Sequence, residues 1–77
     1  MTGRKPAAEP PIPNRITELR EKAGLSRVEL AERVGVNPQT IGYLERGEYN
    51  PSLALAFRLA ELFELPIEGV FLREKGS

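Results

Sequence analysis

The sequence predicts an all-α domain built from five short helices. Apolar residues recur at helical spacing between residues 14 and 72, and N-capping residues and glycines divide this stretch into short segments. No run of residues alternates with the two-residue period of a β-strand. A chain of 77 residues has room for one domain with a small core, and we expect residues 14–72 to form it.

The first 13 residues are rich in proline, and we call them the leader. Four of the seven prolines lie in residues 1–13, where their spacing interrupts any helix or strand. We therefore expect residues 1–13 to be a flexible tail and residues 73–77 to be a short C-terminal tail.

The first two helices are predicted from their capping residues. The first covers residues 14–23, with Asn14 as its N-cap and Gly24 at its end. The second begins after Ser26, which forms a capping box with Glu29 three residues later.

The connection between the second and third helices is very short. Residues 35–37 separate them, and Asn37 and Pro38 supply the N-cap and the first-turn proline of a third helix over residues 38–46. A three-residue connection that contains glycine makes the third helix cross the second at a steep angle. This is the helix-turn-helix geometry.

The fourth helix is predicted over residues 53–64, after the N-cap Ser52, and the fifth over residues 66–71. Apolar side chains cover roughly 220° of the fourth helix, whereas a surface helix needs a stripe of only about 100°. We interpret this helix as a central core helix, one edge of which a second copy of the chain covers. A short terminal β-ribbon is an additional possibility, in which residues 71–73 pair with residues 11–12.

Composition excludes several kinds of chemistry. The chain has no cysteine and no histidine, which removes disulfides, thiol nucleophiles and the commonest general base and metal ligand. We therefore expect no enzyme activity, no metal site and no cofactor. No apolar run reaches the length of a membrane span and no signal peptide is present, so a cytoplasmic protein is expected. Eleven Lys and Arg residues balance eleven Glu residues, so the net charge is zero.

A series of short motifs runs through the first three helices: ITELR at 16–20, GLS at 24–26, ELA at 29–31, GV at 35–36, QTI at 39–41 and LERG at 44–47. In this order and spacing they resemble the phage-repressor (Cro/cI-type, XRE) family of DNA-binding regulators. The segments YNPSL at 49–53 and PIE at 66–68 resemble a small one-domain branch that includes the cytolysin repressor. The resemblance implies a phage-repressor-like helix-turn-helix domain that binds double-stranded DNA and regulates transcription.

The third helix carries the residues expected to read bases. On a helical wheel its outer face holds Gln39, Gly42, Tyr43 and Arg46. The Gln39 amide can bond to both adenine N6 and N7 in the major groove, and Gly42 would permit close approach of a partner. We predict base reading by Pro38, Gln39, Thr40 and Tyr43.

Phosphate contacts are expected on both sides of this helix. Free N–H groups and the helix dipole favour an anion at the N-terminus of the second helix, where Ser26 and Arg27 lie. Arg46, Tyr49 and Asn50 are expected to grip the DNA backbone on the other side.

The resemblance also implies two structural roles. Arg20 and Glu45 occupy positions that form a salt bridge between the first and third helices in the family. A symmetric dimer contact is predicted at Asn50, Pro51, Ile67 and Val70, and the alternative place for Val70 is the core.

Together these features predict a repressor that binds a pseudo-palindromic operator as a homodimer through the recognition helix, residues 38–46, without a small-molecule effector. One alternative is an antitoxin-type autoregulator of a toxin–antitoxin operon. Another is a protein-interaction module that does not bind DNA. The leader also has a second interpretation, as an arm whose Arg4 and Lys5 contact DNA.

Overall fold

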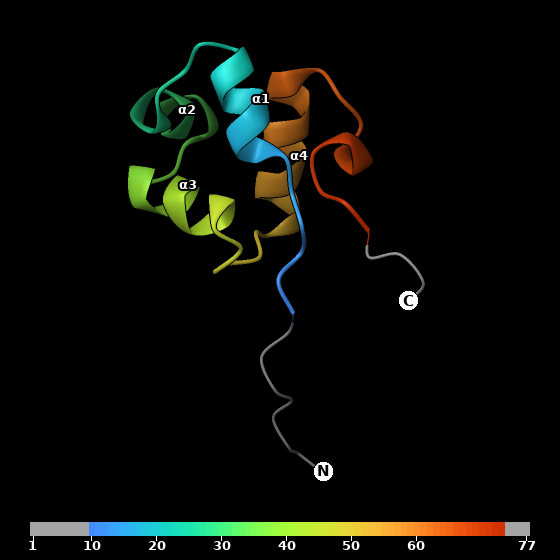
Figure 1. Cartoon of the computed structure of the whole chain (residues 1–77). Coiled ribbons are helices and arrows are strands. Elements are labelled where there is room, and N and C mark those ends of the chain that lie inside the picture. The colour runs from blue at the N-terminus through green and yellow to red at the C-terminus, as the bar shows by residue number, and fades with distance from the viewer. Residues whose placement is uncertain (1–9, 74–77) are drawn as a thin grey trace.

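Four short helices and one helical turn pack around each other within residues 10–73 (Figure 1). The structure is a computed structural model, and it describes residues 10–73. The elements follow in the order α1 (Ile16–Lys22), α2 (Arg27–Val34), α3 (Pro38–Glu45), α4 (Leu53–Phe63) and the 3₁₀ turn η1 (Ile67–Gly69). The predicted all-α class is confirmed. Within the described residues, no helix is both long enough and apolar enough to cross a membrane.

One hydrophobic core holds these elements together. Every α-helix contributes to its largest fully buried side chains, which are Ile16, Leu30, Ile41, Leu44, Leu59 and Val70. Burying a side chain of this size contributes roughly 1.5–3 kcal/mol. The core therefore fixes α2 and α3, which pack directly on one another, against α1 and α4.

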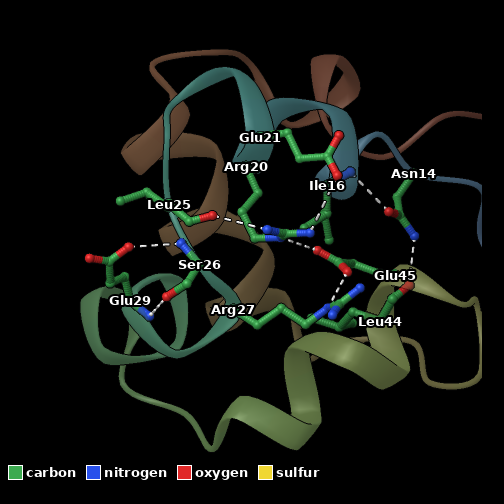
Figure 2. Close-up of polar contacts among 10 residues, drawn as sticks. All are labelled: Asn14, Ile16, Arg20, Glu21, Leu25, Ser26, Arg27, Glu29, Leu44 and Glu45. Atoms are coloured by element: carbon green, nitrogen blue, oxygen red, sulfur yellow. Dashed lines mark hydrogen bonds and ion pairs between the residues drawn. The ribbon is translucent and has the colours of Figure 1, made fainter.

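The predicted starts of α2, α3 and α4 are confirmed. Ser26 Oγ accepts a hydrogen bond from the Glu29 N–H at 3.0 Å, and Glu29 Oε1 accepts one from the Ser26 N–H at 2.8 Å (Figure 2). Asn37 Oδ1 accepts from the Gln39 N–H at 2.9 Å, and Ser52 caps α4 in the same way. These side chains satisfy N–H groups that have no partner inside their helix, so each cap sets where its helix begins.

The turn between α2 and α3 depends on Gly35. Its φ of 77° lies in the left-handed region, which a residue with a Cβ atom adopts only at a cost of about 1–2 kcal/mol. The Gly35 N–H donates to the Ala31 carbonyl at 2.8 Å and closes α2. The predicted helix-turn-helix arrangement of α2 and α3 is therefore present (Figure 1).

α1 begins two residues later than predicted, because Asn14 has a different role. Its Oδ1 accepts from the Ile16 N–H at 3.0 Å, and its Nδ2 donates to the Leu44 carbonyl at 2.8 Å (Figure 2). The residue in the N-cap position, Arg15, makes no side-chain capping bond. Asn14 therefore links the start of α1 to the end of α3.

Both C-terminal predictions need correction. The predicted fifth helix is the three-residue turn η1, and the Val70 carbonyl that follows it accepts from the Arg15 N–H at 2.9 Å. The terminal ribbon is an isolated antiparallel bridge between Asn14 and Phe71. The predicted pairing with residues 11–12 is wrong. Pro11 has no N–H to donate, and the Ile12 N–H donates to Asn50 Oδ1 instead.

Residues 10–13, which belong to the predicted leader, lie along the loop that follows α3. Asn50 Oδ1 accepts from the Ile12 N–H at 3.1 Å, and Asn50 Nδ2 donates to the Pro10 carbonyl at 3.2 Å. Both polar atoms of the Asn50 side chain thus bind this segment. The residues of the predicted arm, Arg4 and Lys5, lie outside the described residues.

Candidate nucleic-acid interface

An open hollow of about 440 Å³ lies between the start of α2 and the exposed face of α3. It is lined by Arg27, Pro38, Gln39, Gly42, Tyr43 and Arg46. Five of these six are residues that the sequence predicts to contact bases or phosphates. The structure therefore brings predicted base readers and predicted phosphate binders into one site.

The predicted base readers lie at the open side of α3. Pro38 and Gln39 are exposed at its N-terminus, and Tyr43 is exposed one turn further on. Thr40 is half-buried and lies outside the lining of the hollow. The exposed amide and phenol can therefore reach a molecule placed against α3, as the helical wheel predicts.

Gly42 lies beside the side chain of Arg46. It is buried, and a Cβ atom added there would lie 3.3 Å from Arg46 Nη1. The space over this glycine is therefore taken by a side chain of the same helix end. A side chain at position 42 would crowd Arg46, and the close approach of a partner to Gly42, which lines the hollow, stays a prediction.

The carboxylate of Glu45 lies between two arginines (Figure 2). Arg20 Nε donates to Glu45 Oε2 at 2.7 Å, and Arg27 Nε donates to Glu45 Oε1 at 2.7 Å. The Glu45 side chain is 3% exposed, against 10% for that of Arg20 and 55% for that of Arg27. The structure thus has the predicted Arg20–Glu45 ion pair and adds a second, exposed cation on the same carboxylate.

Burial raises the pKa of the Glu45 carboxyl, but hydrogen bonds and Coulombic attraction from Arg20 and Arg27 outweigh it. The pKa therefore lies below the ordinary value of 4.5. A carboxyl with a lowered pKa in the folded chain stabilises the fold above its ordinary pKa. That contribution is lost as the pH falls through the folded value. At neutral pH Glu45 is charged and contributes to stability.

Arg46 is held at the C-terminal end of α3 by two neighbours. Its guanidinium carbon lies 5.3 Å from the centroid of the Tyr43 ring, a cation–π distance. Its Nε donates to Glu48 Oε2 at 3.1 Å. The bond to Glu48 and the Coulombic attraction of that carboxylate raise the pKa of Arg46, which is therefore always charged.

The other predicted phosphate binders are placed as follows. The Ser26 hydroxyl oxygen caps α2, and this residue is exposed at the helix N-terminus. Tyr49 is 45% exposed in the loop after α3. Both polar atoms of the Asn50 side chain are bonded to residues 10–13, so a phosphate contact at this position would fall to its backbone.

The structure corrects one residue of the predicted dimer contact, Val70, and takes the alternative that places it in the core. Val70 has no exposed surface, because it packs in the core, so it cannot touch a second chain. Pro51 and Ile67 are half-buried. The apolar arc expected on the fourth helix includes Leu53 and Phe57, whose side chains lie one helical turn apart on α4 and are 66% and 49% exposed. A helical wheel shows that this edge is apolar, and the structure adds that these two side chains are exposed.

Comparison with known proteins gives the family. Residues 16–70 match the family model described as helix-turn-helix (HTH_3). An uncharacterized HTH-type transcriptional regulator from Archaeoglobus fulgidus is 50% identical over 58 residues, which cover 75% of this chain and 83% of that protein. The HTH-type transcriptional regulator YgzD from Bacillus subtilis is 42% identical over 62 residues, which cover 80% of this chain and 94% of that protein.

Solved structures agree with the sequence relatives. The restriction-modification controller protein C.AhdI from Aeromonas hydrophila has a TM-score of 0.66 and 34% identity, over 71% of this chain and 83% of that chain. The N-terminal DNA-binding domain of SinR from Bacillus subtilis has a TM-score of 0.68 and 30% identity, over 82% of this chain and 91% of that chain. The finer likeness to the cytolysin-repressor branch stays a prediction. The chain belongs to the helix-turn-helix family of DNA-binding transcriptional regulators, which is not a class of enzymes.

Proposed function

We propose that this chain is a repressor that binds a pseudo-palindromic DNA operator as a homodimer, with α3 in the major groove. The observation that carries the proposal is the hollow that places Gln39 and Tyr43 beside Arg27 and Arg46. Base-reading and phosphate-binding groups must lie within one site to place a helix in a groove and read it.

Base reading falls to the exposed side chains of α3. Gln39 is at the N-terminal end of the helix, where its amide can pair with adenine N6 and N7. The rings of Pro38 and Tyr43 offer apolar contacts to thymine methyl groups. Thr40 is half-buried, so it contributes at most its methyl group.

Phosphate binding falls to the two arginines of the hollow. Arg27 uses its Nε atom to bind Glu45, which leaves the terminal nitrogens of its guanidinium for a phosphate. Arg46 is 55% exposed on the other side of the site. The two cations therefore flank α3 and would hold it in register over the bases.

A homodimer can read a longer DNA site than one helix can. One reading helix covers about four or five base pairs, and a two-fold axis places a second helix about 34 Å away, one turn along the duplex. We propose that the dimer surface includes Pro51 and Ile67 and extends over the exposed side chains of Leu53 and Phe57. Burial of these two side chains would supply the apolar area that the monomer leaves in water.

The first prediction concerns base preference. Gln39→Ala should weaken binding to the preferred site by about 1–3 kcal/mol and relax the preference at one base pair of each half-site. Arg46→Ala is the matched control, and it should weaken all sequences about equally. Selection of bound sequences from a random pool, followed by competition binding, measures both effects. An unchanged base preference in Gln39→Ala would refute the assignment.

The second prediction separates the two arginines that share Glu45. Arg20→Ala should lower the free energy of unfolding by about 3–5 kcal/mol, because it leaves a buried carboxylate with one partner fewer. Arg27→Ala should lower it by less than about 1 kcal/mol, because this side chain is exposed, and should mainly weaken DNA binding. Urea denaturation and DNA titration of both variants check this. Equal losses of stability would show that the two roles are wrongly divided.

The third prediction concerns the dimer. Leu53→Asp should give a folded monomer that binds the operator much more weakly, because each charge would face an apolar surface and its own symmetry mate. Ile67→Asp should also dissociate the dimer, with some loss of stability since Ile67 packs on the core. Val28→Asp is the control: Val28 is 53% exposed on α2, and this variant should stay dimeric. Sedimentation measures the oligomeric state and circular dichroism the folding of each variant. A dimeric Leu53→Asp protein at micromolar concentration would refute the proposed dimer surface.

A further inference from the structure

Glu48 occupies the polar edge of Arg46. The two residues make a two-point contact, with Arg46 Nε 3.1 Å from Glu48 Oε2 and Arg46 Nη2 3.3 Å from Glu48 Oε1. Two parallel N–H···O bonds to one anion are also the way in which an arginine binds a phosphate. The carboxylate of Glu48 thus fills the position that a DNA phosphate would take on Arg46.

The backbone fixes Glu48 in this position. Gly47 has a φ of 75°, its N–H donates to the Leu44 carbonyl at 3.0 Å, and the Glu48 N–H donates to the Tyr43 carbonyl at 2.9 Å. This pattern is a Schellman motif, which ends α3 and sets the direction in which the next residue leaves the helix. The contact between Glu48 and Arg46 therefore follows from how the helix ends.

The two arginines of the hollow differ in how firmly their carboxylates are held. Glu45, the partner of Arg27, is buried and also binds Arg20. Glu48 is 54% exposed, and its only ion pair among residues 10–73 is with Arg46. An exposed pair of this kind contributes little net free energy, so a phosphate can displace Glu48 at small cost, whereas it cannot displace Glu45.

We propose that Glu48 is an affinity-setting residue, which competes with the DNA backbone for Arg46 and lowers the strength of binding. The inference rests on the proposed DNA-binding function. After displacement, the Glu48 carboxylate stays next to the phosphates and is repelled by them. It would retain a cation there, so that fewer cations are released when the complex forms.

The test is a double-mutant cycle with Glu48→Gln, Arg46→Ala and the double variant. The probe is a fluorescent mixed-sequence duplex about 30 base pairs long, titrated at several NaCl concentrations because phosphate contacts depend on salt. Glu48→Gln should bind about two- to fivefold more tightly, with a salt slope steeper by up to about one per bound subunit. In the Arg46→Ala background, Glu48→Gln should strengthen binding by a smaller factor, because only the repulsion between Glu48 and the phosphates is then removed. Glu61→Gln, which removes an exposed charge from α4, is the matched control and should bind like the wild type.

The outcomes separate the inference from the function beneath it. If Glu48→Gln strengthens binding equally with and without Arg46, Glu48 acts only as a general negative charge and the competitor role is refuted. The same holds if Glu48→Gln binds no more tightly than the wild type. If the wild type and all variants fail to bind the duplex even at about 20 mM NaCl, the proposed DNA-binding function is itself wrong, and the role of Glu48 is wrong with it.

Discussion

The buried carboxylate of Glu45 joins the inside of the domain to its exposed face. It is the last residue of α3, and it binds a nearly buried arginine of α1 on one side and an exposed arginine of α2 on the other. A carboxylate with 3% exposure is stable as an anion only when cations compensate for its lost hydration. This single charge therefore adds to the hydrophobic core in holding the ends of three helices together.

This arrangement explains how a chain with no net charge can present a cationic site. Glu45 neutralises Arg20 inside the fold and orients Arg27 through one nitrogen, which leaves the rest of the Arg27 guanidinium at the hollow. Arg46 lines the same hollow. Its side chain lies close to Gly42, which has no Cβ atom to crowd it, and over the Tyr43 ring. The placement of charges, rather than their sum, decides what the face of α3 can bind.

The sequence predicts best what depends on a few neighbouring residues. The capping box at Ser26 and the N-cap at Asn37 are local signals, and the structure has both. The register of the terminal bridge depends on contacts between the two ends of the domain, such as the bond from Arg15 to Val70, which no local pattern contains. The Arg27–Glu45 pair also joins distant positions, 18 apart, and the resemblance that implies the Arg20–Glu45 pair gives no sign of it.

The most direct test of this account is an NMR titration of the side-chain carboxyl carbon of Glu45 in the wild type and in Arg27→Ala. Two guanidinium groups that outweigh desolvation should place the pKa of Glu45 in the wild type below 4.5, and removal of Arg27 should raise it. The free energy of unfolding should then fall as the pH drops below this ordinary value and the carboxylate takes up a proton. A pKa of Glu45 at or above 4.5 in the wild type would show that burial dominates, and would contradict the claim that this carboxylate holds the three helix ends together.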